Sequence, residues 1–98
     1  MENKITEEKL KKYFSITEEA LTMAKKAKKN NKHTEEVLSM AENYLSDAKH
    51  FKKQGNIVNA FAALNYAHGW LDAGAKIGIF DVNNSELFAG VDKNKEGV

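Results

Sequence analysis

The sequence contains no cysteine, no proline and no arginine. The absence of cysteine excludes disulfide bonds, thiolate metal sites and a cysteine nucleophile. Without arginine, the chain lacks the side chain that grips phosphate and carboxylate groups through two parallel hydrogen bonds and that most often recognises guanine. The absence of proline is expected of a chain that is almost entirely helical, because proline interrupts helices.

A long hydrophobic run is also missing. The longest stretch without a charged residue, 54–71, is interrupted by three asparagines and a histidine, so it does not predict a membrane span. The chain is charged from Glu2 onward, which is unlike a secretory signal peptide. We therefore expect a cytoplasmic protein that makes no contact with a membrane.

The length of 98 residues leaves room for one hydrophobic core. Charges are nearly balanced, with fifteen lysines against fourteen acidic residues and a net charge of +1. We assign residues 6–90 to a single three-helix domain and residues 91–98 to a flexible tail, because the last residues are mainly polar and charged.

Apolar residues recur at helical spacing in three stretches, 6–29, 34–54 and 57–78. Thr6 and Asn56 are suited to cap the first and third helices, and Gly55 is suited to the left-handed position after the second. Because the turn at Gly55 is short, the second and third helices must be antiparallel neighbours. The three matched lengths predict an all-α, up-down-up three-helix bundle with a short C-terminal extension.

The third helix is apolar on most of its circumference. Asp72 and Lys76 are its charged residues, and a helix of this kind is expected to be covered on more than one side. Three groups of positions share faces of this helix: an apolar face (Ile57, Phe61, Leu64, Leu71, Ala75), a seam of small residues (Ala60, Ala67, Gly74, Gly78) and a second apolar arc that includes Tyr66, Trp70 and Ile77.

The arc of Tyr66, Trp70 and Ile77 is the candidate interaction surface. Helix one and the extension could cover it, and the apolar residues of the extension available for this are Phe80, Val82, Leu87 and Phe88. If they do not, the exposed area is of the size that marks a binding site, and we expect a homodimer or a protein partner on this arc.

A polar cluster is the second candidate site. His68 and Asp72 are four residues apart on one helix face, with Asn65 beside them. The turn at Gly55 predicts that positions whose numbers sum to about 110 lie opposite one another, which brings Tyr44 and Asp47 of the second helix within about two turns.

Two interpretations of this cluster compete. It could be a proton-transfer pair or half of a metal site, or it could be a hydrogen-bond network that fixes the second helix against the third. His50 is expected about 12 Å along the helix axis from His68, too far to share a metal ion. We favour the structural interpretation and predict no catalytic residue, no metal site and no cofactor.

Two stretches, YLSDAKHF (44–51) and GNIVNAFAALNYAHGWLDAG (55–74), resemble an archaeal family of short proteins, domain of unknown function three-five-seven. The resemblance extends over residues 10–88. It implies a three-helix bundle and an archaeal source, and it carries no assigned activity. In some relatives the module stands beside a nucleotidyltransferase-like domain, which implies an accessory role.

We predict from these patterns a protein-interaction or accessory module that is not an enzyme. The alternative is a nucleotide- or nucleic-acid-binding accessory domain of a nucleotidyltransferase-like enzyme, for which the lysines in 25–32 would contact phosphate. Those lysines equally complement the dipole at a helix C-terminus, and no aromatic residue lies among them to stack on bases. Nucleic acid is therefore the less favoured partner.

Overall fold

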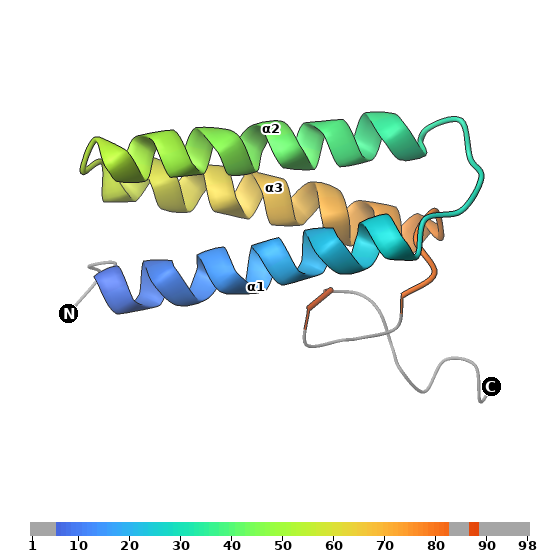
Figure 1. The fold of residues 1–98 in the computed structure, drawn as a ribbon, viewed down its shortest axis with the longest axis horizontal. Coiled ribbons are helices and arrows are strands. Elements are labelled where there is room, and N and C mark those ends of the chain that lie inside the picture. The colour runs from blue at the N-terminus through green and yellow to red at the C-terminus, as the bar shows by residue number, and fades with distance from the viewer. Residues whose placement is uncertain (1–5, 83–86, 89–98) are drawn as a thin grey trace.

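Three helices make up most of the computed structural model, which describes residues 6–82 and 87–88. In chain order they are α1 (Glu7–Lys26), α2 (Thr34–Lys53) and α3 (Ile57–Ile77). Figure 1 shows the three lying side by side, with successive helices running in opposite directions. The predicted all-α, up-down-up bundle is confirmed. The tail predicted at 91–98 lies outside the described residues.

The predicted helix caps are present. The Oγ1 of Thr6 accepts a hydrogen bond of 3.0 Å from the backbone N–H of Lys9 at the start of α1. At the start of α3, the Oδ1 of Asn56 accepts one of 3.2 Å from the N–H of Asn59. Each bond satisfies a backbone donor that has no partner inside its helix. Gly55 adopts a φ of 77°, the left-handed conformation that the turn requires.

The residues that follow α3 turn back onto the bundle at Gly78, whose φ is 86°. The N–H groups of Gly78 and Ile79 both donate to the carbonyl of Gly74, at 3.1 and 3.0 Å, which closes the helix end. The chain then pairs with the segment after α1 through one antiparallel bridge between Lys28 and Phe80.

This bridge also explains where α1 stops. The N–H of Lys29 donates to the carbonyl of Ile79, and the N–H of Asp81 donates to the carbonyl of Ala27, each at 2.9 Å. Backbone groups after Lys26 therefore bond to another segment, and α1 ends three residues before the predicted position 29. The sequence pattern did not predict this pairing.

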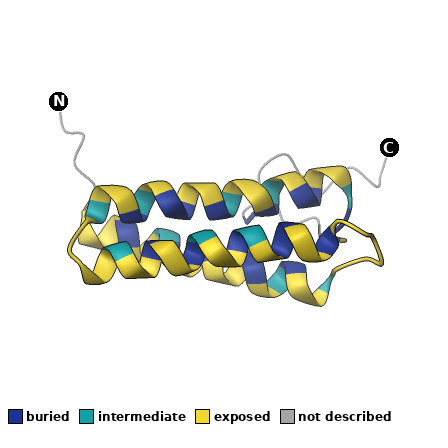
Figure 2. Ribbon diagram, turned by 90° about the horizontal axis from the view of Figure 1, so that it is seen from above, coloured by how far each residue is buried: buried dark blue, intermediate teal, exposed yellow. Residues whose placement is uncertain are grey.

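The core lies between the facing sides of the helices, and Figure 2 shows buried and exposed positions alternating along each of them. α2 and α3 pack most extensively, and α1 contacts α3 more than it contacts α2. Three residues of the small-residue seam, Ala60, Ala67 and Gly74, are buried in this core, and the fourth, Gly78, is half-buried at the end of α3. Small residues at these positions let the neighbouring helices approach closely.

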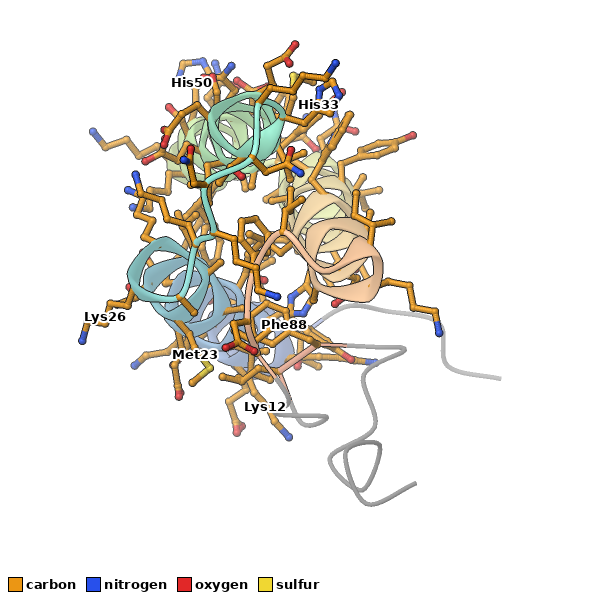
Figure 3. All side chains as sticks on the ribbon, turned by 90° about the vertical axis from the view of Figure 1, so that its right-hand side faces the viewer. Lys12, Met23, Lys26, His33, His50 and Phe88 are labelled. Atoms are coloured by element: carbon orange, nitrogen blue, oxygen red, sulfur yellow. The ribbon has the colours of Figure 1, made fainter. Side chains whose placement is uncertain are left out.

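The extension completes the core and leaves the predicted arc open. Phe80 and Phe88 are among the largest fully buried side chains, and Ile79 and Leu87 are buried with them. Viewed along the bundle, Phe88 lies between α1 and α3 (Figure 3). The residues expected to cover Tyr66, Trp70 and Ile77 thus pack elsewhere in the bundle.

Candidate functional site

One side of α3 faces solvent along the whole helix and is called here the outer face of α3. All residues of α3 are described, and those that are exposed recur at intervals that place them on one side. Seven are apolar or glycine: Val58, Ala62, Tyr66, Gly69, Trp70, Ala73 and Ile77. The other three are Asn59, Asn65 and Lys76.

The large side chains of this face are well exposed. Val58, Tyr66 and Ile77 are 69 %, 62 % and 68 % accessible, and Trp70 is 37 % accessible. Within the described part of the chain, these four are the exposed large hydrophobic residues. Isolated exposed apolar residues are ordinary, but these are gathered on one helix face and form a continuous apolar strip.

The strip continues onto α2. The ring of Tyr44 stacks on that of Tyr66, with centroids 5.2 Å apart and planes inclined by 29°. This pair agrees with the register predicted from the turn at Gly55. Trp70 therefore lies beside the first half of α2, and the two helices present one joint surface.

An open groove of about 720 Å³ runs between α2 and the C-terminal half of α3. Its apolar lining consists of Val37, Met40, Trp70 and Ile77, and its polar rim consists of His33, Glu35, Glu36 and Ser39. A shallower hollow of about 330 Å³ adjoins it, lined by Asn65, Tyr66, Gly69, Trp70 and Ala73. An apolar floor with a polar rim is the arrangement found at the centre of protein interfaces.

His68 points away from this face, toward α1 and the C-terminal extension. Its Nε2 donates to the carbonyl oxygen of Leu87 at 2.5 Å, and its Nδ1 is 3.2 Å from the Oγ1 of Thr17. Because a carbonyl can only accept, Nε2 carries a proton, and Nδ1 forms the second bond with the Thr17 hydroxyl, which can donate or accept. Both ring nitrogens are thereby bonded.

The predicted polar cluster is only partly assembled. The Oδ1 of Asp72 lies 3.6 Å from the Nε2 of His68, longer than a hydrogen bond. Tyr44 stacks on Tyr66 instead, and Asp47 and Asn65 are both exposed. The network at His68 joins α3 to α1 and the extension, not to α2 as expected from the sequence.

Thr17 is buried on the core side of α1, and nothing in the sequence pattern indicated it as a partner of His68. Leu87 gave no signal either, because its backbone carbonyl, not its side chain, makes the bond. Among the described residues, no group of three or more histidine, cysteine or acidic side chains is arranged to hold a metal ion. His50 lies on α2 and His33 directly before it, on the side of the bundle away from Phe88 (Figure 3).

Two of the lysines in 25–32 form ion pairs with carboxylates of α2. Lys25 pairs with Glu42, and Lys28 pairs with Glu35 at 2.8 Å. These bonds tie the end of α1 to the first half of α2. They give the lysine run a structural use that does not require phosphate.

A second lysine-rich region lies in an open groove of about 800 Å³ between α1 and α2, whose lining includes Lys11, Phe14, Lys49, Lys52 and Lys53. The Nζ of Lys52 sits over the ring of Phe14, 5.2 Å from its centroid, and Lys49 pairs with Glu18 at 3.1 Å. These two cations already interact with groups of the chain itself.

Comparison with known proteins gives one match. The family described as "Protein of unknown function (DUF357)" matches residues 12–80, which include α2, α3 and most of α1. No curated protein and no solved structure matches the chain. In the described part of the chain, none of the helices is long and apolar enough to cross a membrane.

Proposed function

The chain belongs to the DUF357 family, whose description assigns no activity, and we propose that it is a protein-interaction module that docks a partner on the outer face of α3. The observation that carries the proposal is the continuous exposure of seven apolar or glycine positions on that face. Exposed apolar area of this kind lowers solubility and is usually retained where a partner covers it.

The residue types of the face suit this role. Tryptophan and tyrosine are the side chains that most often dominate the binding energy of an interface, since each buries a large rigid area and keeps a polar group for hydrogen bonding. Trp70 and Tyr66 lie next to each other on the face and both line the hollow at Gly69. Gly69 leaves open space there, because a Cβ at this position would meet nothing within 4 Å.

A helix is the partner element that fits best. The face is straight and about 30 Å long, since α3 has 21 residues that each rise 1.5 Å. An amphipathic helix laid along it would bury its own apolar stripe between α3 and α2, as in other helix-in-groove complexes. The acidic Glu36 on the rim favours a basic residue at the edge of that partner, whereas Glu35 already pairs with Lys28.

The proposed role is not catalytic. His68 is the residue best placed for proton transfer by its type and by the neighbouring Asp72, but both of its ring nitrogens hold the fold together. A general acid or base needs a free nitrogen within reach of a substrate proton.

The groove between α1 and α2 favours a second candidate, an accessory domain that binds a nucleotide or nucleic acid through lysine contacts to phosphate. It ranks below the first because Lys49 and Lys52 already have partners in the chain. Calorimetric titration with ATP and with a short single-stranded oligonucleotide tests it. Salt-dependent binding that is lost in Lys49→Ala/Lys52→Ala would establish this candidate.

The interaction proposal is tested by affinity capture from a lysate of the source organism. The tagged chain is compared with Trp70→Ala/Ile77→Ser, which removes two apolar side chains of the face. A matched control, Lys12→Ala/Glu19→Ser, changes two exposed residues of α1. Mass spectrometry measures the amount of each captured protein. We expect the wild type and the control to retain the same specific proteins. Trp70→Ala/Ile77→Ser should retain at least about tenfold less of them, because it lacks two anchor residues of the interface.

Equal recovery of every captured protein by the two variants would contradict the proposal. Circular dichroism of both variants checks that the helices are intact. Untagged copies of the chain among the captured proteins are evaluated separately, because they would show self-association and not binding of a different protein.

A further inference from the structure

We infer that the groove between α1 and α2 binds an acidic segment of a partner protein, on a surface separate from the outer face of α3. The groove has a volume of about 800 Å³ and is open to solvent. Its lining contains four lysines and one glutamate, a net charge of +3 with His50 counted as neutral. Because the whole chain carries +1, all other residues together sum to −2, and the positive charge is concentrated in this groove.

The lysines of the groove are not equally available. Toward the middle of the bundle, Lys49 pairs with Glu18 at 3.1 Å, so these two charges cancel. The three other lysines lie toward the start of α1 and the end of α2, and they are Lys11, Lys52 and Lys53. Neither Lys11 nor Lys53 forms an ion pair with a residue that the structure describes. An anionic partner therefore meets the full charge of +3 at this end of the groove.

Helix dipoles account for only part of this arrangement. Lys52 and Lys53 lie in the last turn of α2, where cations offset the negative end of the dipole. Lys11 lies in the second turn of α1, near the end of the helix at which the dipole favours anions. The first-turn residues Glu7 and Glu8 do not line the groove. Lys11 thus gains nothing from the dipole of its own helix and adds a cation to the opposite wall.

The floor between these lysines is apolar, and the walls leave room for a chain segment. Phe14 is buried, and the Nζ of Lys52 lies 5.2 Å from the centroid of its ring. Because Lys52 is exposed, its ammonium can stay over the ring and still donate to a carboxylate on the solvent side. Ser15 and Ser46, one from each helix, are short side chains whose hydroxyls can also donate to a carboxylate.

The basic groups of the groove suit carboxylates. The ammonium of lysine is a point charge on a flexible stem, so it binds a carboxylate without needing the fixed fork of arginine. Lys11 on one wall and Lys53 on the other can approach a segment lying between them from both sides. The groove extends about 10 Å from Lys11 to Glu18. Acidic residues four apart in a helix are about 6 Å apart, so a short helical segment presents two successive carboxylates over this length.

Nucleic acid fits this groove less well than an acidic peptide does. A phosphate backbone that follows the seam between α1 and α2 would pass Glu18 and then Glu42, whose negative charges lie beside its path. Among the described residues that line the groove, the phenylalanine is Phe14, which is buried under Lys52, so bases find no exposed ring of this kind to stack on. A short acidic segment that ends before Glu18 avoids this repulsion.

An NMR titration of the isotope-labelled chain with two synthetic peptides tests the inference. The first is an alanine-based helical peptide of about 15 residues with glutamates at i,i+4 spacing, and the second carries glutamine in place of each glutamate. We expect the glutamate peptide to shift the amide signals of the groove residues, with a Kd that rises with salt concentration, and the glutamine peptide to leave them unchanged. Trp70→Ala/Ile77→Ser should bind the glutamate peptide as the wild type does, so this inference and the proposed function can fail separately.

Two charge variants distinguish the groove from general attraction between opposite charges. Lys11→Gln/Lys53→Gln removes two lysines of the groove, and Lys9→Gln/Lys12→Gln removes the same charge from exposed positions of α1 that do not line it. We expect the first variant to bind the glutamate peptide at least about tenfold more weakly and the second to bind it within about twofold of the wild type.

Equal weakening in both variants, or no binding of the glutamate peptide at about 1 mM, would overturn the inference. A single-stranded oligonucleotide that shifts the same signals at lower concentration than the glutamate peptide would also overturn it, and would assign the groove to nucleic acid.

Discussion

The ring of Phe80 occupies the space that a side chain at Gly74 would need. A Cβ built on Gly74 would lie 2.9 Å from both Cδ2 and Cζ of that ring, and closer still to Cε2. Gly74 is the residue whose carbonyl closes the end of α3, and Phe80 is held by the bridge to Lys28. The absence of one side chain therefore lets the extension seal this end of the core.

Gly74→Ala should destabilise the protein by about 1–3 kcal/mol, because the buried Phe80 ring must move to admit a methyl group in a closely packed core. Urea denaturation followed by circular dichroism measures this change in the free energy of unfolding. A variant as stable as the wild type would show that Phe80 can shift without loss of contacts.

Gly69→Ala is the matched experiment in the same helix, and the opposite sign is expected. A Cβ at Gly69 meets nothing within 4 Å, so the substitution only removes the entropy disadvantage of glycine in a helix. At protein concentrations low enough to keep the chain monomeric, we expect a gain of about 0.5–1 kcal/mol in the same urea measurement. Destabilisation at both glycines would mean that position 69 is also packed.

Ala67→Leu should destabilise the protein by about 1–3 kcal/mol, since Ala67 is fully buried and the larger side chain has no room between the helices. Thermal unfolding provides the measurement. Ala73→Leu on the exposed side of the same helix is the control, and its melting temperature in the monomer should stay close to that of the wild type. An unchanged melting temperature for Ala67→Leu would contradict its position in the core.

His68→Ala should cost about 1–2 kcal/mol through the loss of two hydrogen bonds that join α3 to α1 and the extension. Thr17→Val removes one of these bonds while leaving the shape of the side chain nearly unchanged. In a double-mutant cycle, the two substitutions should cost less together than the sum of the single effects, because they share one bond. If the two changes in the free energy of unfolding were additive, the hydrogen bond between Thr17 and His68 would contribute nothing to stability.

Added zinc or manganese should leave the melting temperature of the wild type unchanged, because both ring nitrogens of His68 are engaged in hydrogen bonds. The measurement is a thermal shift in the presence and absence of each ion. A stabilisation that disappears in His68→Ala would instead assign metal binding to this residue.

Trp70→Ala/Ile77→Ser should leave the helical content within error of the wild type, since both side chains are exposed and neither belongs to the core. If the face is covered by a second copy, the emission of Trp70, the single tryptophan, should shift to shorter wavelength as the wild type is concentrated. Emission independent of concentration would count against coverage of Trp70 by a second copy.

Local sequence signals were sufficient to predict the three helices. Thr6 and Asn56 mark helix starts and Gly55 marks a turn through hydrogen bonds and backbone angles that involve only neighbouring residues. The period of apolar residues predicted which side of α1 and α2 faces the core, and the short turn fixed the register that brings Tyr44 beside Tyr66.

The tertiary structure decided what covers α3 and what His68 contacts. Both depend on residues far apart in the chain: Phe80 pairs with the segment after α1, and His68 bonds to Thr17 and to the carbonyl of Leu87. A helical wheel gives the direction of each side chain around its own axis but not the element that lies in that direction. The sequence by itself therefore determined that α3 has two apolar sides, and only the packing of the extension against α1 left the side of Tyr66, Trp70 and Ile77 exposed.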